Sequence, residues 1–207
     1  MKIPLFASLI LCCIWLAFAI SRSRKRAEQT ERDFWEREAQ ADNTRKKPLD
    51  ELNFVEIPYE QLPFSVLPDD PALSDAVADC HRILNGFREK KAVNLTGISN
   101  TDLKLTYGAP NLELLTGYDE NYTLLVRTMQ KWADLLIKAG CTKEAVPIME
   151  FCIDTHTDIS ATYRTLAGIY REENRPDKIE HLRETADSLN SIMRQPIKRM
   201  LEESENS

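Results

Sequence analysis

Two adjoining segments of equal length make up much of the C-terminal half, VRTMQKWADLLIKAGCTKEAVPIMEFCIDTHTDI (residues 126–159) and SATYRTLAGIYREENRPDKIEHLRETADSLNSIM (residues 160–193). A shift of 34 residues places side chains of similar character on one another. The aligned pairs are Trp132 and Leu166, Ala133 and Ala167, Leu136 and Tyr170, Gly140 and Asn174, Ala145 and Ile179, and Cys152 and Ala186. Apolar residues spaced three and four apart, with a turn residue between two such runs, predict a helix–turn–helix unit in each copy.

This period resembles the tetratricopeptide repeat, whose pattern W-x₂-L-G-x₂-Y and then A-x₃-F recurs every 34 residues. The matching motifs are Tyr163-x₂-Leu166-Ala167-x₂-Tyr170 in the second copy, and Met129-x₂-Trp132-Ala133-x₂-Leu136 with Ala145-x₃-Met149 in the first. The copies depart from the pattern at Arg183, where a large apolar residue is expected, at Pro147, and in lacking the closing proline. A generic array of helical hairpins is the alternative interpretation.

The composition agrees with an all-α protein that has one modest core. The chain has 207 residues, of which 43% are hydrophobic and only 6 are glycine. Its net charge of -6 argues against nucleic acid as a partner, because phosphate binding needs a cationic surface.

We expect the α-helical domain to span residues 70–203. Asp70 followed by Pro71 predicts an N-cap and the first helical position of a helix that runs into residues 72–91. Glycines and a proline in residues 92–120 predict short helices and turns, with Asp119 as the cap of the next long helix. The C-terminal residues are expected to cover the end of the repeats, with Pro196 interrupting them.

Residues 48–69 are rich in both proline and apolar residues, so they are neither a continuous helix nor a plain linker. We interpret them as an extended strap laid over the helical domain, with a short strand at NFVEI (residues 53–57). The alternative is a peptide that another protein binds.

An uncharged run, IPLFASLILCCIWLAFAI, occupies residues 3–20, and residues 21–47 hold nine basic and six acidic side chains. As a helix, the run would be about 27 Å long, close to the thickness of a bilayer's hydrocarbon core, and flanking positive charge stays cytoplasmic. We therefore expect an all-α protein with one transmembrane helix at 3–20, a charged juxtamembrane stalk at 21–47, and a cytoplasmic C-terminal domain. The alternative is a signal peptide cleaved after Ala19, which gives a secreted protein.

The sequence holds few candidates for chemistry. Cys152 and His156 lie four residues apart, but no third and fourth ligand follows at a spacing typical of a metal site. Phosphate-loop, dinucleotide and nucleophile-elbow motifs are missing from the sequence. We expect no enzyme, no catalytic residues, no metal and no cofactor.

The resemblance implies a binding surface, because the first helix of each tetratricopeptide repeat lines a groove that receives a peptide. The positions carried over are Arg127, Gln130, Asp134, Ile137 and Lys138 in the first copy, and Ala161, Arg164, Gly168, Arg171 and Glu172 in the second. Four of them are basic, which suits an acidic peptide or a C-terminal carboxylate. The alternative is a set of ordinary solvated charges.

From these features we expect a membrane-anchored cytoplasmic adaptor or scaffold that binds a protein or peptide. Peptide binding is assigned to Arg127, Gln130, Asp134, Lys138, Arg164 and Arg171. The alternatives are an exported helical-repeat protein in envelope assembly and an enzyme with an unrecognised site. The sequence leaves the oligomeric state open.

Overall fold

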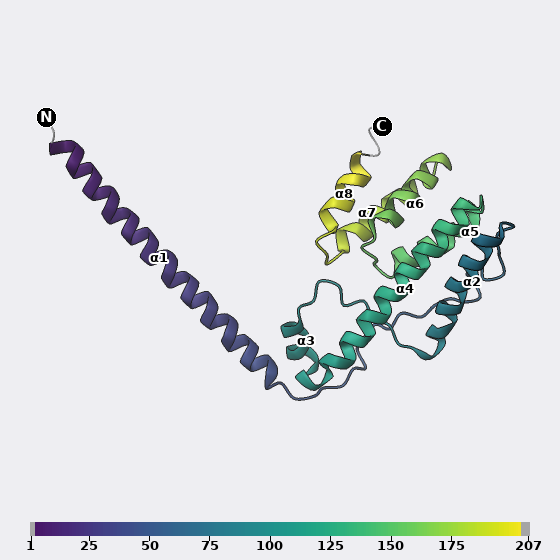
Figure 1. The fold of residues 1–207 in the computed structure, drawn as a ribbon, viewed down its shortest axis with the longest axis horizontal. Coiled ribbons are helices and arrows are strands. Elements are labelled where there is room, and N and C mark those ends of the chain that lie inside the picture. Colours follow the sequence, from purple (N-terminus) through teal and green to yellow (C-terminus); the bar gives the residue numbers. More distant parts are fainter. Residues whose placement is uncertain (1–2, 204–207) are drawn as a thin grey trace. The chain divides into compact units, whose positions relative to one another are not determined.

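The computed structural model describes residues 3–203, with the backbone only for residues 3–11, 13 and 14. Within this range the chain forms eight α-helices and two short 3₁₀-helices and has no strand, which confirms the predicted all-α class (Figure 1). The elements are α1 (Ile3–Asp42), α2 (Pro71–Asn85), η1 (Gly86–Glu89), α3 (Asn100–Tyr107), η2 (Ala109–Asn111), α4 (Leu112–Lys138), α5 (Thr142–Asp154), α6 (Ser160–Glu172), α7 (Pro176–Ser188) and α8 (Arg194–Glu203).

The chain divides into two compact units. Unit 1 comprises the chain up to Lys47 together with Asn100–Leu112, and unit 2 comprises Pro48–Ser99 together with the chain from Glu113 onward. In unit 1, ion pairs join the last turns of α1 to α3. The Lys104 ammonium lies 3.2 Å from Glu38 and 2.6 Å from Asp42.

The predicted transmembrane helix over residues 3–20 is wrong, because none of the described helices is both long enough and apolar enough to cross a membrane. Residues 3–20 do not form an element of their own. They begin the 40-residue helix α1, which continues through twelve charged residues to Asp42. Most of the predicted span falls on residues whose side chains lie outside the described ones. The cytoplasmic location stays a prediction.

Unit 2 begins its helices where the sequence indicates. The Asp70 carboxylate accepts a hydrogen bond from the backbone N–H of Leu73 at 2.9 Å, and Pro71 is the first residue of α2. This confirms the predicted N-cap.

Three of the four pairs of helix bounds in the two copies differ by 34 residues, but α4 begins at Leu112 and α6 at Ser160. Helices α4 and α6 end at Lys138 and Glu172, and helices α5 and α7 begin at Thr142 and Pro176. The two intervening turns also match, since Gly140 and Asn174 have positive φ angles of 80° and 54°. In each turn the N–H of this residue bonds the carbonyl three residues earlier, and the next N–H bonds the carbonyl five residues earlier. This is the Schellman arrangement, which satisfies carbonyl groups at a helix end.

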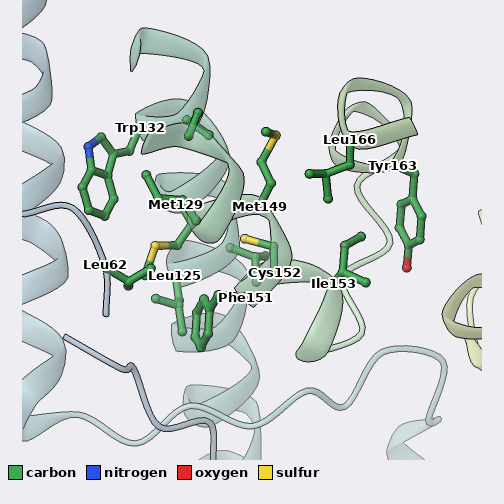
Figure 2. Packing of buried hydrophobic residues seen from close by; sticks show 14 of the residues in the cluster. Leu62, Leu125, Met129, Trp132, Met149, Phe151, Cys152, Ile153, Tyr163 and Leu166 are labelled. Carbon is green, nitrogen blue, oxygen red and sulfur yellow. The ribbon is translucent and has the colours of Figure 1, made fainter. Parts of the chain in front are cut away.

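The core of unit 2 is built around α4. Met129, Trp132, Ala133 and Leu136 are all 0% exposed and belong to one cluster with side chains of α2, α5, α6, α7 and α8. Figure 2 shows Leu62, from the proline-rich strap, among the buried side chains of this cluster. Four further strap residues pack against it, namely Val55, Ile57, Phe64 and Val66.

Three local predictions are wrong. Asp119 is not a cap, because α4 begins earlier and continues through Gly117, and the Asp119 carboxylate instead accepts the Leu95 N–H at 3.0 Å. The segment NFVEI forms only an isolated antiparallel bridge between Phe54 and Val93. Pro196 does not interrupt α8, because it lies in the first turn, where a missing N–H removes no intrahelical bond.

The shared turn gives a test of the repeat geometry. We expect Gly140→Ala to lower the free energy of unfolding by about 1–2 kcal/mol, because a Cβ disfavours the left-handed conformation. No described atom lies within 4 Å of a Cβ at this position, so the loss is conformational and not steric. Urea unfolding measures it.

Gly168→Ala is the matched control, since a Cβ there also meets no described atom within 4 Å but the residue is helical. It is expected to raise stability by up to about 1 kcal/mol. An equal loss in both variants would contradict the role assigned to the Gly140 turn.

Candidate functional site

The structure separates the predicted peptide-binding residues into two groups. Arg127, Lys138, Arg164 and Arg171 are exposed on α4 and α6. Gln130 is buried and links the two helices, because its carbonyl accepts the Thr162 hydroxyl at 2.5 Å and its amide donates to Asp134 at 2.8 Å. The Gln130–Thr162 hydrogen bond therefore joins α4 to α6, Asp134 supports the Gln130 amide, and Arg127, Lys138 and Arg164 are exposed to solvent.

A separate cavity of about 700 Å³ lies within unit 2. We call it the strap cavity, and it is lined by the strap, the loop before α3, and the segments at the C-terminal ends of α5 and α7. Its lining residues are Asn53, Phe54, Val55, Glu56, Pro58, Asn94, Thr96, Ile98, Phe151, Asp154, Thr155, His156, Ser188, Leu189, Asn190 and Ser191. Its volume falls within the range typical of small-ligand and peptide side-chain pockets.

Asn94 fixes the loop wall of the strap cavity to the end of α5. Its amide nitrogen lies 3.0 Å from the Tyr122 hydroxyl and from the carbonyl oxygens of Thr155 and His156. The Tyr122 hydroxyl itself donates to the Thr155 carbonyl at 2.9 Å. Burial raises the pKa of Tyr122 far above its ordinary value, so this hydroxyl stays a proton donor.

The same loop contacts the segment after α7 so closely that no side chain would fit at Gly97. A Cβ on Gly97 would lie 1.7 Å from the backbone oxygen of Asn190, and the φ of Gly97 is 78°. The Asn190 amide donates to the Gly97 carbonyl at 3.1 Å, and Ser191 donates to Asp158 at 2.5 Å. These contacts join three walls of the cavity that are far apart in the sequence.

The end of α5 forms a third Schellman turn, with His156 in the left-handed conformation at φ 60°. The N–H of His156 bonds the Ile153 carbonyl at 2.8 Å, and the N–H of Thr157 bonds the Cys152 carbonyl at 3.1 Å. On the strap side of the cavity, the ring of Phe54 lies edge-on to Tyr118 at 5.5 Å and beneath the Lys91 ammonium at 4.5 Å. These contacts hold this part of the strap in place.

Cys152 and His156, the pair considered for metal binding, do not act together. Cys152 is 0% exposed in the core, and burial raises the pKa of its thiol to about 12. His156 is exposed, and its Nδ1 lies 3.2 Å from the Asp154 carbonyl oxygen. Among the side chains that the structure describes, no group of three potential ligands is placed to hold a metal ion.

A smaller cavity of about 90 Å³ lies between α5, α6 and α7 and contains a closed ionic cluster. The Glu150 carboxylate accepts hydrogen bonds from the Lys178 ammonium and from the Tyr170 hydroxyl, each at 2.7 Å. Burial by itself raises the pKa of Glu150, but these bonds and the Lys178 charge outweigh it and hold the pKa below the ordinary 4.5. The cluster is a structural link between helices of the two copies.

No family model matches the chain, and searches of curated proteins and of solved structures also found no match. The tetratricopeptide resemblance therefore stays a prediction.

Sequence reasoning missed the strap cavity. Its walls come from segments as far apart as Glu56 and Asn190, and no local pattern predicts that these segments meet. Asn94 is part of an Asn-x-Thr triplet, and the Thr96 N–H donates to the side-chain oxygen Oδ1 of Asn94 at 3.0 Å. The triplet marks a local turn in the sequence, but it does not reveal the long-range hydrogen bonds of Asn94.

The Asn94 bonds predict a clear loss of stability. We expect Asn94→Ala to lower the free energy of unfolding by about 1–2 kcal/mol, because it leaves the His156 carbonyl without its donor. Asn53→Ala is the control, since Asn53 lines the same cavity but is exposed. Equal urea midpoints for the two variants would show that the Asn94 bonds do not hold the wall.

Glu150 predicts a pH dependence. Its lowered pKa means that the folded state gains stability above the ordinary 4.5 and loses it as the pH falls through the lower folded-state value. The free energy of unfolding, followed from pH 6 down to pH 3 by urea denaturation, should fall less steeply in Glu150→Gln than in the parent chain. Parallel curves would contradict the role of the Lys178 and Tyr170 contacts.

Proposed function

We propose that this protein is an interaction module, an adaptor or scaffold, whose helical unit binds an acidic segment of a partner protein on the exposed basic side chains of α4 and α6. The observation that carries the proposal is the state of these side chains. Arg127, Lys138 and Arg164 are exposed, and no described carboxylate lies within ion-pairing distance of any of them. The chain as a whole carries a net charge of -6.

The helices that present these residues are held at a fixed spacing, which favours recognition of a defined ligand. The Gln130–Thr162 hydrogen bond spans α4 and α6, and it is buried. Below it, Trp132, Ala133, Leu166 and Ala167 form part of the core. Because the helices are already ordered, binding of a carboxylate restricts the basic side chains but not the backbone that carries them.

Arginine adds directionality to this surface. A guanidinium group offers several N–H donors in a plane and can hold both oxygens of a carboxylate, whether from a Glu or Asp side chain or from a C-terminus. An acidic peptide lying across α4 and α6 would contact Arg127 of one helix and Arg164 of the other.

The test is the affinity of the full chain for a fluorescein-labelled ten-residue peptide of alternating Glu and Ser, measured by fluorescence anisotropy. We expect Arg127→Glu combined with Arg164→Glu to weaken binding about tenfold. Exchanging attraction for repulsion at two exposed sites changes the binding free energy by roughly 1–2 kcal/mol.

Lys143→Glu combined with Arg199→Glu is the matched control, because both residues are exposed, lie on α5 and α8, and give the same change in net charge. We expect this pair to leave the affinity within about twofold. In 0.15 M salt the Debye length is about 8 Å, so exposed charges farther than that from the peptide are largely screened. An equal loss in both double variants would mean that net charge, and not this surface, binds the peptide.

A further inference from the structure

The strap cavity has the opposite charge character to the basic surface. Its lining side chains include two carboxylates, Glu56 and Asp154, and no lysine or arginine among the described residues. Both carboxylates are exposed to solvent. The remaining polar side chains are amides and hydroxyls, and among the described lining residues His156 is the only other titratable one.

The two helices that end at the cavity strengthen this character. Asp154 and Ser188 are the last residues of α5 and α7, and both line the cavity. The C-terminal end of a helix carries the equivalent of about half a negative charge. The Schellman turn at His156 and the Asn94 bonds satisfy several carbonyls at the end of α5, so this helix contributes less than that charge.

Two side chains with nitrogen groups contact lining residues from outside the cavity. The Lys91 ammonium lies over the ring of Phe54 at 4.5 Å, and His181 Nε2 lies 3.6 Å from one oxygen of Asp154. Neither Lys91 nor His181 lines the cavity. An anionic ligand would therefore meet carboxylates and helix C-termini, while a cationic ligand would meet complementary charge.

The apolar part of the lining defines the shape of that ligand. Phe54, Pro58, Phe151 and Leu189 offer surface for a chain of methylene groups. A volume of about 700 Å³ holds a long side chain with its flanking backbone. Among cationic side chains, arginine has five donors that can reach several carboxylate and amide oxygens together.

We propose that the strap cavity binds an arginine side chain of a partner protein, with the guanidinium group between Glu56 and Asp154 and the methylene stem on Phe54 and Leu189. This site is distinct from the basic surface of α4 and α6, and it does not depend on the function proposed for that surface.

The experiment measures binding of the full chain to a fluorescein-labelled nine-residue Gly/Ser peptide with one central arginine. A peptide with citrulline in place of arginine has nearly the same shape without the charge, and we expect it to bind at least about tenfold more weakly. Equal affinity for the two peptides, or no binding of the arginine peptide, would overturn the proposal.

Glu56→Gln combined with Asp154→Asn should weaken arginine-peptide binding about tenfold while preserving the helical circular dichroism spectrum, because both side chains are exposed. The matched control is Glu60→Gln combined with Asp69→Asn, which removes the same charge from exposed strap residues outside the cavity lining. We expect the control pair to bind within about twofold of the parent chain. An equal loss in both pairs would show that attraction comes from the net charge alone.

Two further arms separate the remaining explanations. Free agmatine, which carries the same guanidinium and stem without a peptide backbone, should compete far more weakly than the peptide; equal competition would overturn the assignment to a protein partner. The Arg127→Glu and Arg164→Glu variant should bind the arginine peptide at least as tightly as the parent chain. A loss there would place the peptide on the basic surface and overturn the cavity proposal.

Discussion

Unit 2 depends on covering α4 from two sides. A helical hairpin buries only one face against its partner, so a short array needs other elements to cover what remains apolar. Trp132 shows the second cover directly, because its ring lies 4.8 Å from the strap residue Phe64 and 4.7 Å from His81 of α2. Truncating a fully buried tryptophan typically costs about 3–5 kcal/mol, a large fraction of the stability of a domain. These rings contact one another without hydrogen bonds to His81 Nε2 or Trp132 Nε1 among the described residues, and burial lowers the pKa of His81.

The same cover creates the strap cavity. The Tyr59 hydroxyl donates to the Leu84 carbonyl at 2.7 Å and its ring lies beneath the Arg88 guanidinium at 3.9 Å, which anchors the middle of the strap to α2 and η1. Before this anchor, the Val55 N–H bonds the Ala92 carbonyl at 2.9 Å, and Pro58 has no N–H with which to extend the pairing. The strap packs on the core at Leu62 and Phe64, and at Asn53–Glu56 it also lines the strap cavity, with Val55 still against the core. Packing that stabilises the core thus determines the shape of the candidate site.

The sequence predicted the parts of this structure that depend on local signals. Helix bounds 34 residues apart, the Asp70 cap and the two turns at Gly140 and Asn174 follow from periodicity and from backbone preferences.

The sequence-based predictions failed where contacts between distant segments determine the structure. Aspartate is a residue type that often caps helices, but the Asp119 carboxylate accepts a hydrogen bond from the Leu95 N–H. Helix α4 continues through Gly117, and its buried face stabilises it. The uncharged run at residues 3–20 predicted a separate spanning helix, but it is the beginning of a longer one. The strap cavity could not be predicted, because it depends on hydrogen bonds between distant residues such as Asn94 and Thr155, which no local sequence pattern connects.

The small number of basic side chains on α4 and α6 limits how tightly this surface can bind an acidic peptide. Helices α4 and α6 carry the basic side chains of the proposed peptide site, and α8 buries Ile197 and Leu201 at 0% exposure. Exposed ion pairs contribute about 0.2–1 kcal/mol each, so the basic side chains of one short surface give weak affinity. If the strap cavity binds arginine as proposed, this limit changes, because a partner with both an acidic and an arginine-bearing segment would bind the second site at a high effective concentration. The two proposed sites use different residues, the basic side chains of α4 and α6 for one and the strap with the ends of α5 and α7 for the other, so binding at one does not remove the residues of the other. Partners that carry only one of the two segments would bind weakly. Two weak sites at a fixed separation would therefore give specificity for a partner with both segments.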